Sequence, residues 1–257
     1  MYMLSGGMDH AVCLWICPIL HQQTPRIPAP INAIPPTTDL PERYSYPHLS
    51  TTAIHTDYVD CVDFFNDFIL SKSSREGKIV LWQIHGFDSQ RVIDTALPSS
   101  MLQPPTTHEW KETRSAFGES VQRLMQFEIR YCEPWFMKFG LYTSPVEPTK
   151  VAQTLVQTHL QGPGQGTFLA MGNSNGNVYV WDLSVFEGGA NVAVSGKGEV
   201  LGKTLTDPFT FMKPHVTLTV PKLKKMIRMM AWSHWGEYLV GVGDMGLLCL
   251  WQVAHNE

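Results

Sequence analysis

Short apolar stretches separated by polar turns recur along this chain, and each has the length of a β-strand. In four places one such stretch leads through a Gly- or Ser-containing turn into a second stretch that reaches Trp. These hairpins are "YMLSGGMDHAVCLW" at Trp15, "FILSKSSREGKIVLW" at Trp82, "FLAMGNSNGNVYVWDL" at Trp181 and "YLVGVGDMGLLCLW" at Trp251. The repetition predicts an all-β fold built from similar sheets.

A further apolar stretch precedes three of the hairpins and predicts a first strand for each sheet. These stretches are "YVDCVDFF" (58–65), "WFMKFGL" (135–141) and "IRMMAWS" (227–233). The order of strand, hairpin and terminal Trp resembles the blades of WD-repeat proteins, which are four-stranded sheets arranged radially in a β-propeller.

In WD-repeat blades a His, a Ser, an Asp and the Trp form a buried hydrogen-bonded set. His55 precedes the strand at 58–65, and Asp9 stands six residues before Trp15. At the matching offset the later hairpins carry Glu76, Asn175 and Met245, so the polar set decays along the chain. The residues predicted to be structural are Ser5, Asp9, Trp15, His55, Trp82, Trp181 and Trp251.

The spacing between these tryptophans exceeds the ~40–45 residues of a minimal blade, which predicts long insertions. Residues 18–50 hold eight of the 18 prolines, a composition typical of an extended surface loop. A helix-like stretch is expected within 86–125, around "SAFGESVQRLMQF". The predicted organisation is a partial blade (1–17), an insertion (18–50), a blade (51–85), an insertion (86–125), a blade (126–183), an insertion (184–224) and a last blade without its closing strand (225–257).

Three and a half blades do not close a ring, and an open blade edge leaves unpaired backbone groups. We therefore expect that the rest of a propeller, of seven blades in all, is supplied from outside this sequence. Either the chain is a truncated product, which we favour, or a separate chain completes the ring.

The composition favours a folded protein without a membrane or nucleic-acid role. Of the 257 residues, 44% are hydrophobic and 16% charged, and the net charge of −4 argues against a general nucleic-acid binder. No apolar run reaches the ~18 residues of a membrane span, and the N-terminus lacks the features of a signal peptide. Five scattered cysteines, several in apolar runs, indicate free thiols in the cytosol or nucleus.

Three stretches are more specific than the general blade pattern. They are "IHTDYVDCVDFFNDFILSKS" (54–73), "CEPWFMKF" (132–139) and "LAMGNSNGNVYVWDL" (169–183). In these stretches the chain resembles the C-terminal half of the Polycomb WD-repeat subunits, the family of embryonic ectoderm development (EED) and extra sex combs. The resemblance extends from Met1 to about Gln252, apart from the three insertions.

This resemblance implies a nuclear, non-catalytic scaffold of Polycomb repressive complex 2. Such a subunit holds an N-terminal helix of the enhancer-of-zeste histone methyltransferase on one face. With its other face it reads trimethyl-lysine on a histone tail, which stimulates the methyltransferase. No cofactor is implied.

The resemblance also assigns roles to particular residues. Trp135 and Phe136 match two neighbouring aromatics of the methyl-lysine cage. In a strand, adjacent side chains point to opposite faces, so the pair is expected at the mouth of a strand, where both can turn toward a ligand. The remaining cage aromatics of the family lie outside this sequence. Residues that match the peptide groove are Tyr58, Asp60, Lys138 and Arg228.

Other functions have weaker support. Cys13 and Cys17, with His10 and His21, suggest zinc, but no second Cys pair accompanies them, so we expect no metal. The basic "KLKKMIR" (222–228) reads as a solvated loop, with contact to nucleosomal DNA or an acidic partner surface as the alternative. No constellation of catalytic residues is apparent, which predicts that the chain is not an enzyme. The remaining alternative is a generic WD-repeat scaffold that does not read methyl-lysine.

Overall fold

The computed structural model describes residues 2–16, 46–90, 112–118, 120–143, 166–183, 209, 211–220 and 223–253. Within these residues the chain forms four sheets and one short 3-10 helix, η4 (Asp244–Gly246). The expected all-β fold is therefore confirmed for the described part of the chain.

Each sheet is built around one of the predicted hairpins. The first sheet has the strand order β1 (Tyr2–Gly6), β2 (Val12–Ile16), β3 (Leu49–Thr51) and β7 (Thr113–Ser115). The second has the order β4 (Val59–Phe65), β5 (Phe68–Ser73), β6 (Lys78–Ile84), β8 (Val121–Glu128) and β12 (Phe211–Met212). The third has β9 (Gly140–Thr143), β10 (Thr167–Gly172), β11 (Asn177–Asp182) and β13 (Val216–Thr219). The last has β14 (Ile227–Trp232), β15 (Tyr238–Gly243) and β16 (Leu248–Gln252).

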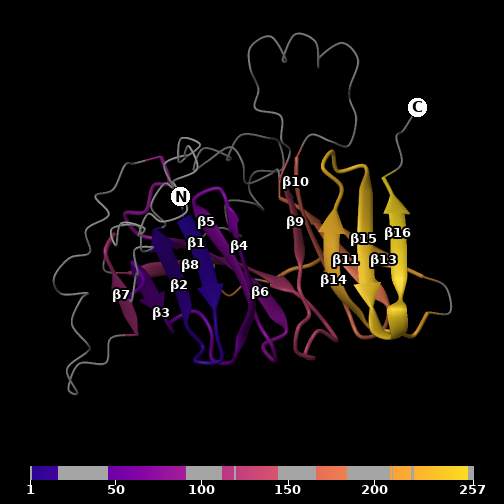
Figure 1. Cartoon of the computed structure of the whole chain (residues 1–257), viewed down its shortest axis with the longest axis horizontal. Helices are drawn as coiled ribbons and strands as arrows, with labels where there is room; N and C mark the ends of the chain where they lie inside the picture. Colours follow the sequence, from indigo (N-terminus) through magenta and orange to yellow (C-terminus); the bar gives the residue numbers. More distant parts are fainter. Residues whose placement is uncertain are drawn as a thin grey trace, which may run out of the picture.

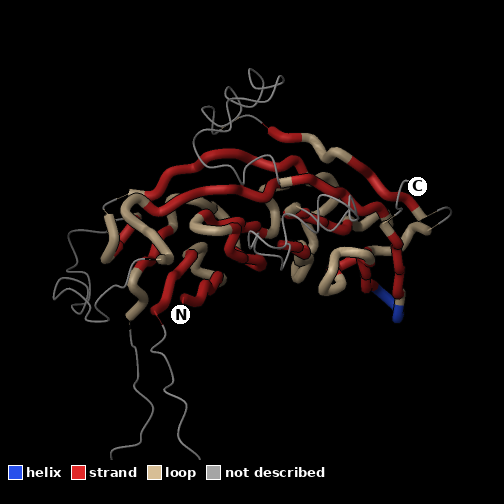
Figure 2. Tube along the Cα trace, turned by 90° about the horizontal axis from the view of Figure 1, so that it is seen from above, coloured by secondary structure: helices blue, strands red, loops and turns tan. Residues whose placement is uncertain are grey.

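The four sheets follow one another in chain order, from the first sheet at the left of Figure 1 to the last at the right. Seen from above, they trace an open arc (Figure 2). The predicted hairpins turn after β1, β5, β10 and β15, at residues 7–11, 74–77, 173–176 and 244–247. These four turns gather at one end of the strands, at the bottom of Figure 1.

Close approach at two glycines joins the first sheet to the second and the third sheet to the last at this end. A Cβ on Gly6 would lie 2.6 Å from a side-chain carbon of Val59, and one on Gly172 would lie 2.5 Å from the carbonyl oxygen of Ile227. Gly6 ends β1 and Val59 begins β4, while Gly172 ends β10 and Ile227 begins β14. Glycine at these two positions therefore lets neighbouring sheets meet without a steric clash.

The helix-like stretch expected around 115–127 is wrong, because Val121–Glu128 forms strand β8 and pairs with β6 along its length. The pairing shifts register between Leu81 and Trp82, which face Met125 and Arg123, so Leu124 is the extra residue of a bulge. This bulge places apolar side chains three and four positions apart, a spacing that imitates a helix.

The described parts of the expected insertions contain strands that complete the sheets. Strands β7 and the start of β8 lie within 86–125, and β12 and β13 lie within 184–224. The expected first strand at 135–141 is also misplaced, since β9 begins only at Gly140 and Trp135 lies in a turn. β7 and β12 have only three and two residues, too few to show the apolar alternation that identified the inner strands.

Two outer strands connect neighbouring sheets. β7 pairs with β3 of the first sheet, and the chain then enters β8 of the second sheet. β12 pairs in parallel with β8 of the second sheet, and after Lys213–His215 the chain enters β13 of the third. The indole N–H of Trp181 donates to the carbonyl oxygen of Met212 at 3.3 Å, which ties β12 to the third sheet as well.

The last sheet differs from the others because no strand of the described chain pairs with the outer edge of β16. Trp251 is half-buried there, whereas Trp82 and Trp181 are fully buried. An apolar hollow of ≈ 480 Å³ lies beside Trp251, bounded by Val216 and Leu218 of β13 and by Trp232. None of the described segments forms a helix that could span a membrane.

Candidate functional site

A row of aromatic rings crosses the hairpin-turn end of the arc. Tyr58 and Trp135 meet edge to face with ring centroids 4.9 Å apart, and Trp135 meets Phe136 with centroids 5.9 Å apart. His10, in the turn between β1 and β2, continues the row with its ring 5.5 Å from that of Tyr58. The structure therefore brings together aromatic side chains from the first, second and third sheets.

Trp135 and Phe136 lie in a turn before β9 rather than in a strand, so the alternation of strand side chains does not apply to them. Phe136 has φ 58°, the left-handed conformation that is uncommon for a residue other than glycine. Trp135 is 36% exposed and Phe136 65% exposed. The turn thus leaves two adjacent aromatic faces open to solvent at the same end of the sheets.

Asp60 lies beside this turn as half of a buried ion pair. Its two carboxylate oxygens accept hydrogen bonds from Lys72 Nζ at 3.0 and 3.1 Å, and the Lys72 side chain is fully buried. Burial raises the pKa of Asp60, while the Lys72 ammonium and a hydrogen bond from the backbone N–H of Phe136 lower it in part. The negative charge of Asp60 is therefore largely compensated within the protein.

Arg228 and Lys138 take different positions around the turn. Arg228 Nη1 donates to the carbonyl oxygen of Trp135 at 3.0 Å, and its Nε donates to Asp244 Oδ1 at 2.5 Å. Lys138 is exposed, and its backbone N–H donates to the carbonyl oxygen of Arg228 at 2.7 Å. Tyr58, Asp60 and Arg228 thus lie beside the turn that carries the aromatic pair. Lys138 follows that turn along the chain.

A buried chain of hydrogen bonds stabilises the second sheet. Trp82 Nε1–H donates to Ser71 Oγ at 2.9 Å, and Ser71 Oγ lies 2.7 Å from His55 Nε2. His55 Nδ1 lies 2.7 Å from Glu76 Oε2. An ionised Glu76 can only accept, so the Nδ1–H of His55 donates to it, and Nε2 of the neutral ring then accepts from the Ser71 hydroxyl. Glu76 therefore takes the place of the expected Asp.

Burial lowers the pKa of His55, so the ring is neutral in this chain of bonds. Burial alone would raise the pKa of Glu76. Hydrogen bonds from His55 and from the backbone N–H and hydroxyl of Thr56, at 2.7 and 2.8 Å, instead lower the pKa of Glu76 well below its usual range.

The other sheets keep only parts of this set. Trp15 Nε1–H donates to Ser5 Oγ at 2.9 Å, and Asp9 Oδ1 accepts from the backbone N–H of Ala11 at 3.2 Å. In the third sheet the turn is held by buried Asn173, whose Oδ1 accepts two backbone N–H groups, whereas Asn175 is exposed. Met245 is 89% exposed.

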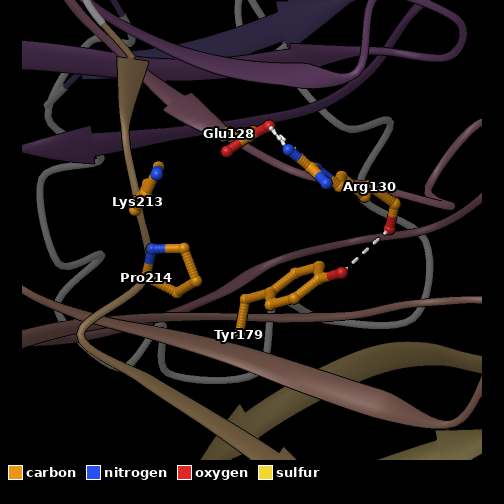
Figure 3. A pocket seen from close by; sticks show the side chains of 5 residues that line it. All are labelled: Glu128, Arg130, Tyr179, Lys213 and Pro214. Carbon is orange, nitrogen blue, oxygen red and sulfur yellow. Dashed lines mark hydrogen bonds and ion pairs between the residues drawn. The ribbon is translucent and has the colours of Figure 1, made fainter.

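A polar pocket of ≈ 330 Å³ opens between the second and third sheets (Figure 3). It is lined by Glu128, Arg130, Tyr179, Lys213 and Pro214. Arg130 and Glu128 pair with each other at 2.7 Å, and the Tyr179 hydroxyl donates to the carbonyl oxygen of Arg130 at 3.4 Å. Two of the three charged side chains of this pocket, Glu128 and Arg130, are thus paired with each other.

The described residues contain no group of three or more potential metal-ligating side chains. Cys17 and His21, two members of the considered zinc set, lie outside the described residues. Four cysteines are free thiols, namely Cys13, Cys61, Cys132 and Cys249. Burial raises the pKa of Cys61 and of Cys132 to about 12, so neither is poised as a nucleophile.

Sequence reasoning missed three residues of this region. Lys72 was hidden in the strand "FILSKS", although a Lys within a strand that begins with an apolar run can signal a buried ion pair. Asp244 was passed over because Met245 stood at the expected offset. His10 joins the row through a turn at φ 66°, which no local pattern predicts.

Comparisons with known proteins place this arrangement in context. No family model matches the chain. The chain is 33% identical over 195 residues to Polycomb protein EED of Chaetomium thermophilum, which covers 72% of this chain and 28% of that protein. It is 30% identical over 183 residues to Polycomb protein esc of Drosophila melanogaster, covering 70% of this chain and 33% of that protein. The chain thus spans about a third of the length of these relatives.

Solved structures give the same result for the fold. A chain in a humanized mutant of the Chaetomium thermophilum Polycomb Repressive Complex 2, bound to the inhibitor GSK343, matches with a TM-score of 0.67 and 26% identity. That match covers 98% of this chain and 58% of the other. A ctPRC2 structure in complex with H3K27me3 and H3K27M matches with a TM-score of 0.67 at 23% identity, covering 98% and 60% of the two chains.

The four sheets match a β-propeller protein over part of that protein's length, which defines the class of fold. Within that class, the chain belongs to the EED/esc/FIE family of Polycomb WD-repeat proteins. This membership supports the expectation that it is not an enzyme.

Proposed function

We propose that this chain is part of a nuclear scaffold subunit of Polycomb repressive complex 2 that reads trimethyl-lysine on a histone tail. The observation that carries the proposal is the exposed, roughly perpendicular pair of Trp135 and Phe136, backed by Tyr58. The ctPRC2 structure of the same fold in complex with H3K27me3 supports this choice of ligand.

The chemistry of the ligand fits aromatic side chains. A trimethylammonium group keeps its charge but has no N–H donor, so an electron-rich ring face is its best partner. Each such contact contributes about 0.5–2 kcal/mol, depending on how far water is excluded. Trp135 and Phe136 supply two faces, and further aromatic side chains from the rest of the propeller would complete the cage.

The groove residues have separate parts in this proposal. Tyr58 and Asp60 border the aromatic pair on the side of the second sheet, and Lys138 is exposed beyond it. Because Asp60 is paired with Lys72, it contributes a polar edge more than a free negative charge. The peptide is therefore selected mainly by its methylated ammonium rather than by ion pairing.

The same proposal includes a structural role for the propeller. The four sheets would be consecutive blades of a seven-bladed ring, of which this chain forms a part. The opposite face would hold the enhancer-of-zeste methyltransferase, as implied by family membership. Co-purification of that methyltransferase with the full-length protein tests this part.

The methyl-lysine part is tested by titrating the full-length protein with fluorescent H3K27me3 and unmodified H3 peptides. We expect tighter binding of the trimethylated peptide, lost in Trp135→Ala. Trp235→Ala is the matched control, because Trp235 is 56% exposed and lies in the turn between β14 and β15, at the opposite end of the strands. Equal affinity of the wild-type protein for both peptides would favour a scaffold without methyl-lysine reading.

A further inference from the structure

The peptide unit that joins Trp135 to Phe136 is contacted by a charged side chain on each side. Its carbonyl oxygen accepts a hydrogen bond from Arg228 Nη1 at 3.0 Å. Its N–H lies near the Asp60 carboxylate, whose pKa it lowers in part. Asp60 belongs to β4 of the second sheet, and Arg228 belongs to β14 of the last. The peptide unit itself lies in the turn before β9 of the third sheet, so it is flanked by residues from both neighbouring sheets.

Each of these two side chains is itself held by an opposite charge. Arg228 Nε donates to Asp244 Oδ1 at 2.5 Å, and Asp244 begins η4, after β15. Asp60 accepts from Lys72, which is fully buried and reaches both carboxylate oxygens. Ion pairs with this geometry restrict the rotamers of both partners, so the two contacts to the peptide unit have fixed positions.

The turn needs such support. Phe136 has φ 58°, which L-residues adopt only at an energetic cost. The Phe136 ring is largely exposed, and the Trp135 ring is partly exposed, so packing against the core restrains them little. A conformation of this kind persists only when the surrounding structure specifies it.

We propose that Asp60, Lys72, Arg228 and Asp244 form a clamp on the 135–136 peptide unit that preorganises the aromatic pair for a methylated ammonium. The proposal rests on the proposed function and extends it to residues behind the binding surface. It makes Arg228 a positioning residue, rather than a direct contact of the bound peptide. Preorganisation matters here because a turn that must be ordered on binding reduces the affinity by the cost of ordering it.

Asp244 is the most informative position for a test, because it contacts Arg228 and not the aromatic rings. In the full-length protein, Asp244→Ala should bind H3K27me3 peptide about five- to tenfold more weakly, about 1–1.4 kcal/mol. Asp244→Asn keeps an acceptor for Arg228 Nε and should stay within about twofold of wild type. Arg130→Met is the control. It also removes one partner of an ion pair, the Arg130–Glu128 pair of the polar pocket (Figure 3), and it should leave peptide binding unchanged.

A second measurement separates this proposal from the proposed function. Amide hydrogen exchange at Phe136 reports on the turn without any ligand, and it should be at least about tenfold faster in Asp244→Ala and in Arg228→Met. Unchanged exchange in both variants would overturn the clamp, even if peptide binding fell. If wild type bound no trimethylated peptide, the proposed function would fail, while the exchange result would still decide whether the clamp exists.

Discussion

The ring of Tyr58 meets the ring of Trp135 edge to face, at 4.9 Å between centroids and 85° between planes. Tyr58 directly precedes β4 of the second sheet, and Trp135 lies in the turn before β9 of the third. The second sheet therefore supports the aromatic site of the third from the side, through a ring contact as well as through Asp60.

This contact predicts different effects for two changes at Tyr58. Tyr58→Ala removes the ring that supports Trp135 and should weaken H3K27me3 binding by about 0.5–1.5 kcal/mol, the usual contribution of an aromatic pair. Tyr58→Phe keeps the ring and should bind within about twofold of wild type. Titration of the full-length variants checks this, and a large loss in Tyr58→Phe would show that the hydroxyl is the important group.

Phe136→Gly separates stability from binding at the aromatic site. Glycine adopts positive φ without the cost that Phe136 bears, about 1–2 kcal/mol, although it loses more chain entropy on folding. The melting temperature should therefore be unchanged or raised, while H3K27me3 binding should be lost with the ring. A lower melting temperature would mean that the Phe136 ring is needed for packing.

Ser71→Ala tests the hydrogen-bonded chain in the second sheet. The change leaves both Trp82 Nε1–H and His55 Nε2 buried without the partner that they share. The free energy of unfolding should fall by about 2–3 kcal/mol, measured by urea denaturation. Ser5→Ala removes a single bond, from half-buried Trp15, and should cost about 1 kcal/mol or less. Equal losses in the two variants would contradict this account.

The same residues predict loss of stability in acid. The pKa of His55 is lowered by burial, so the unfolded chain takes up a proton near pH 6.5 while the folded ring stays neutral. The pKa of Glu76 is also lowered, so its contribution is complete above the unfolded value of about 4.3 and is lost as the pH falls toward the folded value. Both effects reduce the free energy of unfolding as the pH decreases.

Urea unfolding at pH 7, 5.5 and 4 measures this dependence. Glu76→Gln should be less stable than wild type at pH 7 and should lose less stability below about pH 4.5, because the carboxylate that titrates there is absent. Parallel pH profiles for the two proteins would show that Glu76 is not responsible for the acid sensitivity.

Much of the fold was predictable because the inner strands alternate and end on tryptophan. The hairpins at Trp15, Trp82, Trp181 and Trp251 all occur where the pattern placed them. β8 was taken for a helix because of the bulge at Leu124, and β7 and β12 are too short and exposed for any pattern. Local periodicity of apolar residues detects strands with a buried face. Strands β7 and β12 have little buried surface, and only their pairing with a neighbouring strand identifies them.

The residues of the candidate site also divide into those that the sequence identified and those that only the structure reveals. Trp135 and Phe136 were identified from resemblance, and their exposure depends on a turn whose positive φ is not encoded by a Gly or Asn. Lys72 and Asp244 act through partners 12 and 16 residues away along the chain, Asp60 and Arg228. Such pairs become visible only when the strands are placed side by side.

The outer strands also determine how the arc would respond to mechanical load. Continuous backbone crosses from the first sheet to the second through β7 and β8, and from the second to the third through β12 and β13, with ladder bonds on both sides of each crossing. Between the third and last sheets, no such crossing of the outer edge occurs in the part of the chain that the structure describes. These two sheets are joined instead through their inner strands, where the Lys138 N–H donates to the carbonyl oxygen of Arg228 at 2.7 Å and the Ile227 N–H donates to that of Asn173 at 3.0 Å. Since Arg228 also reaches across this seam to Trp135, a load that separated the third and last sheets would disturb the aromatic pair directly.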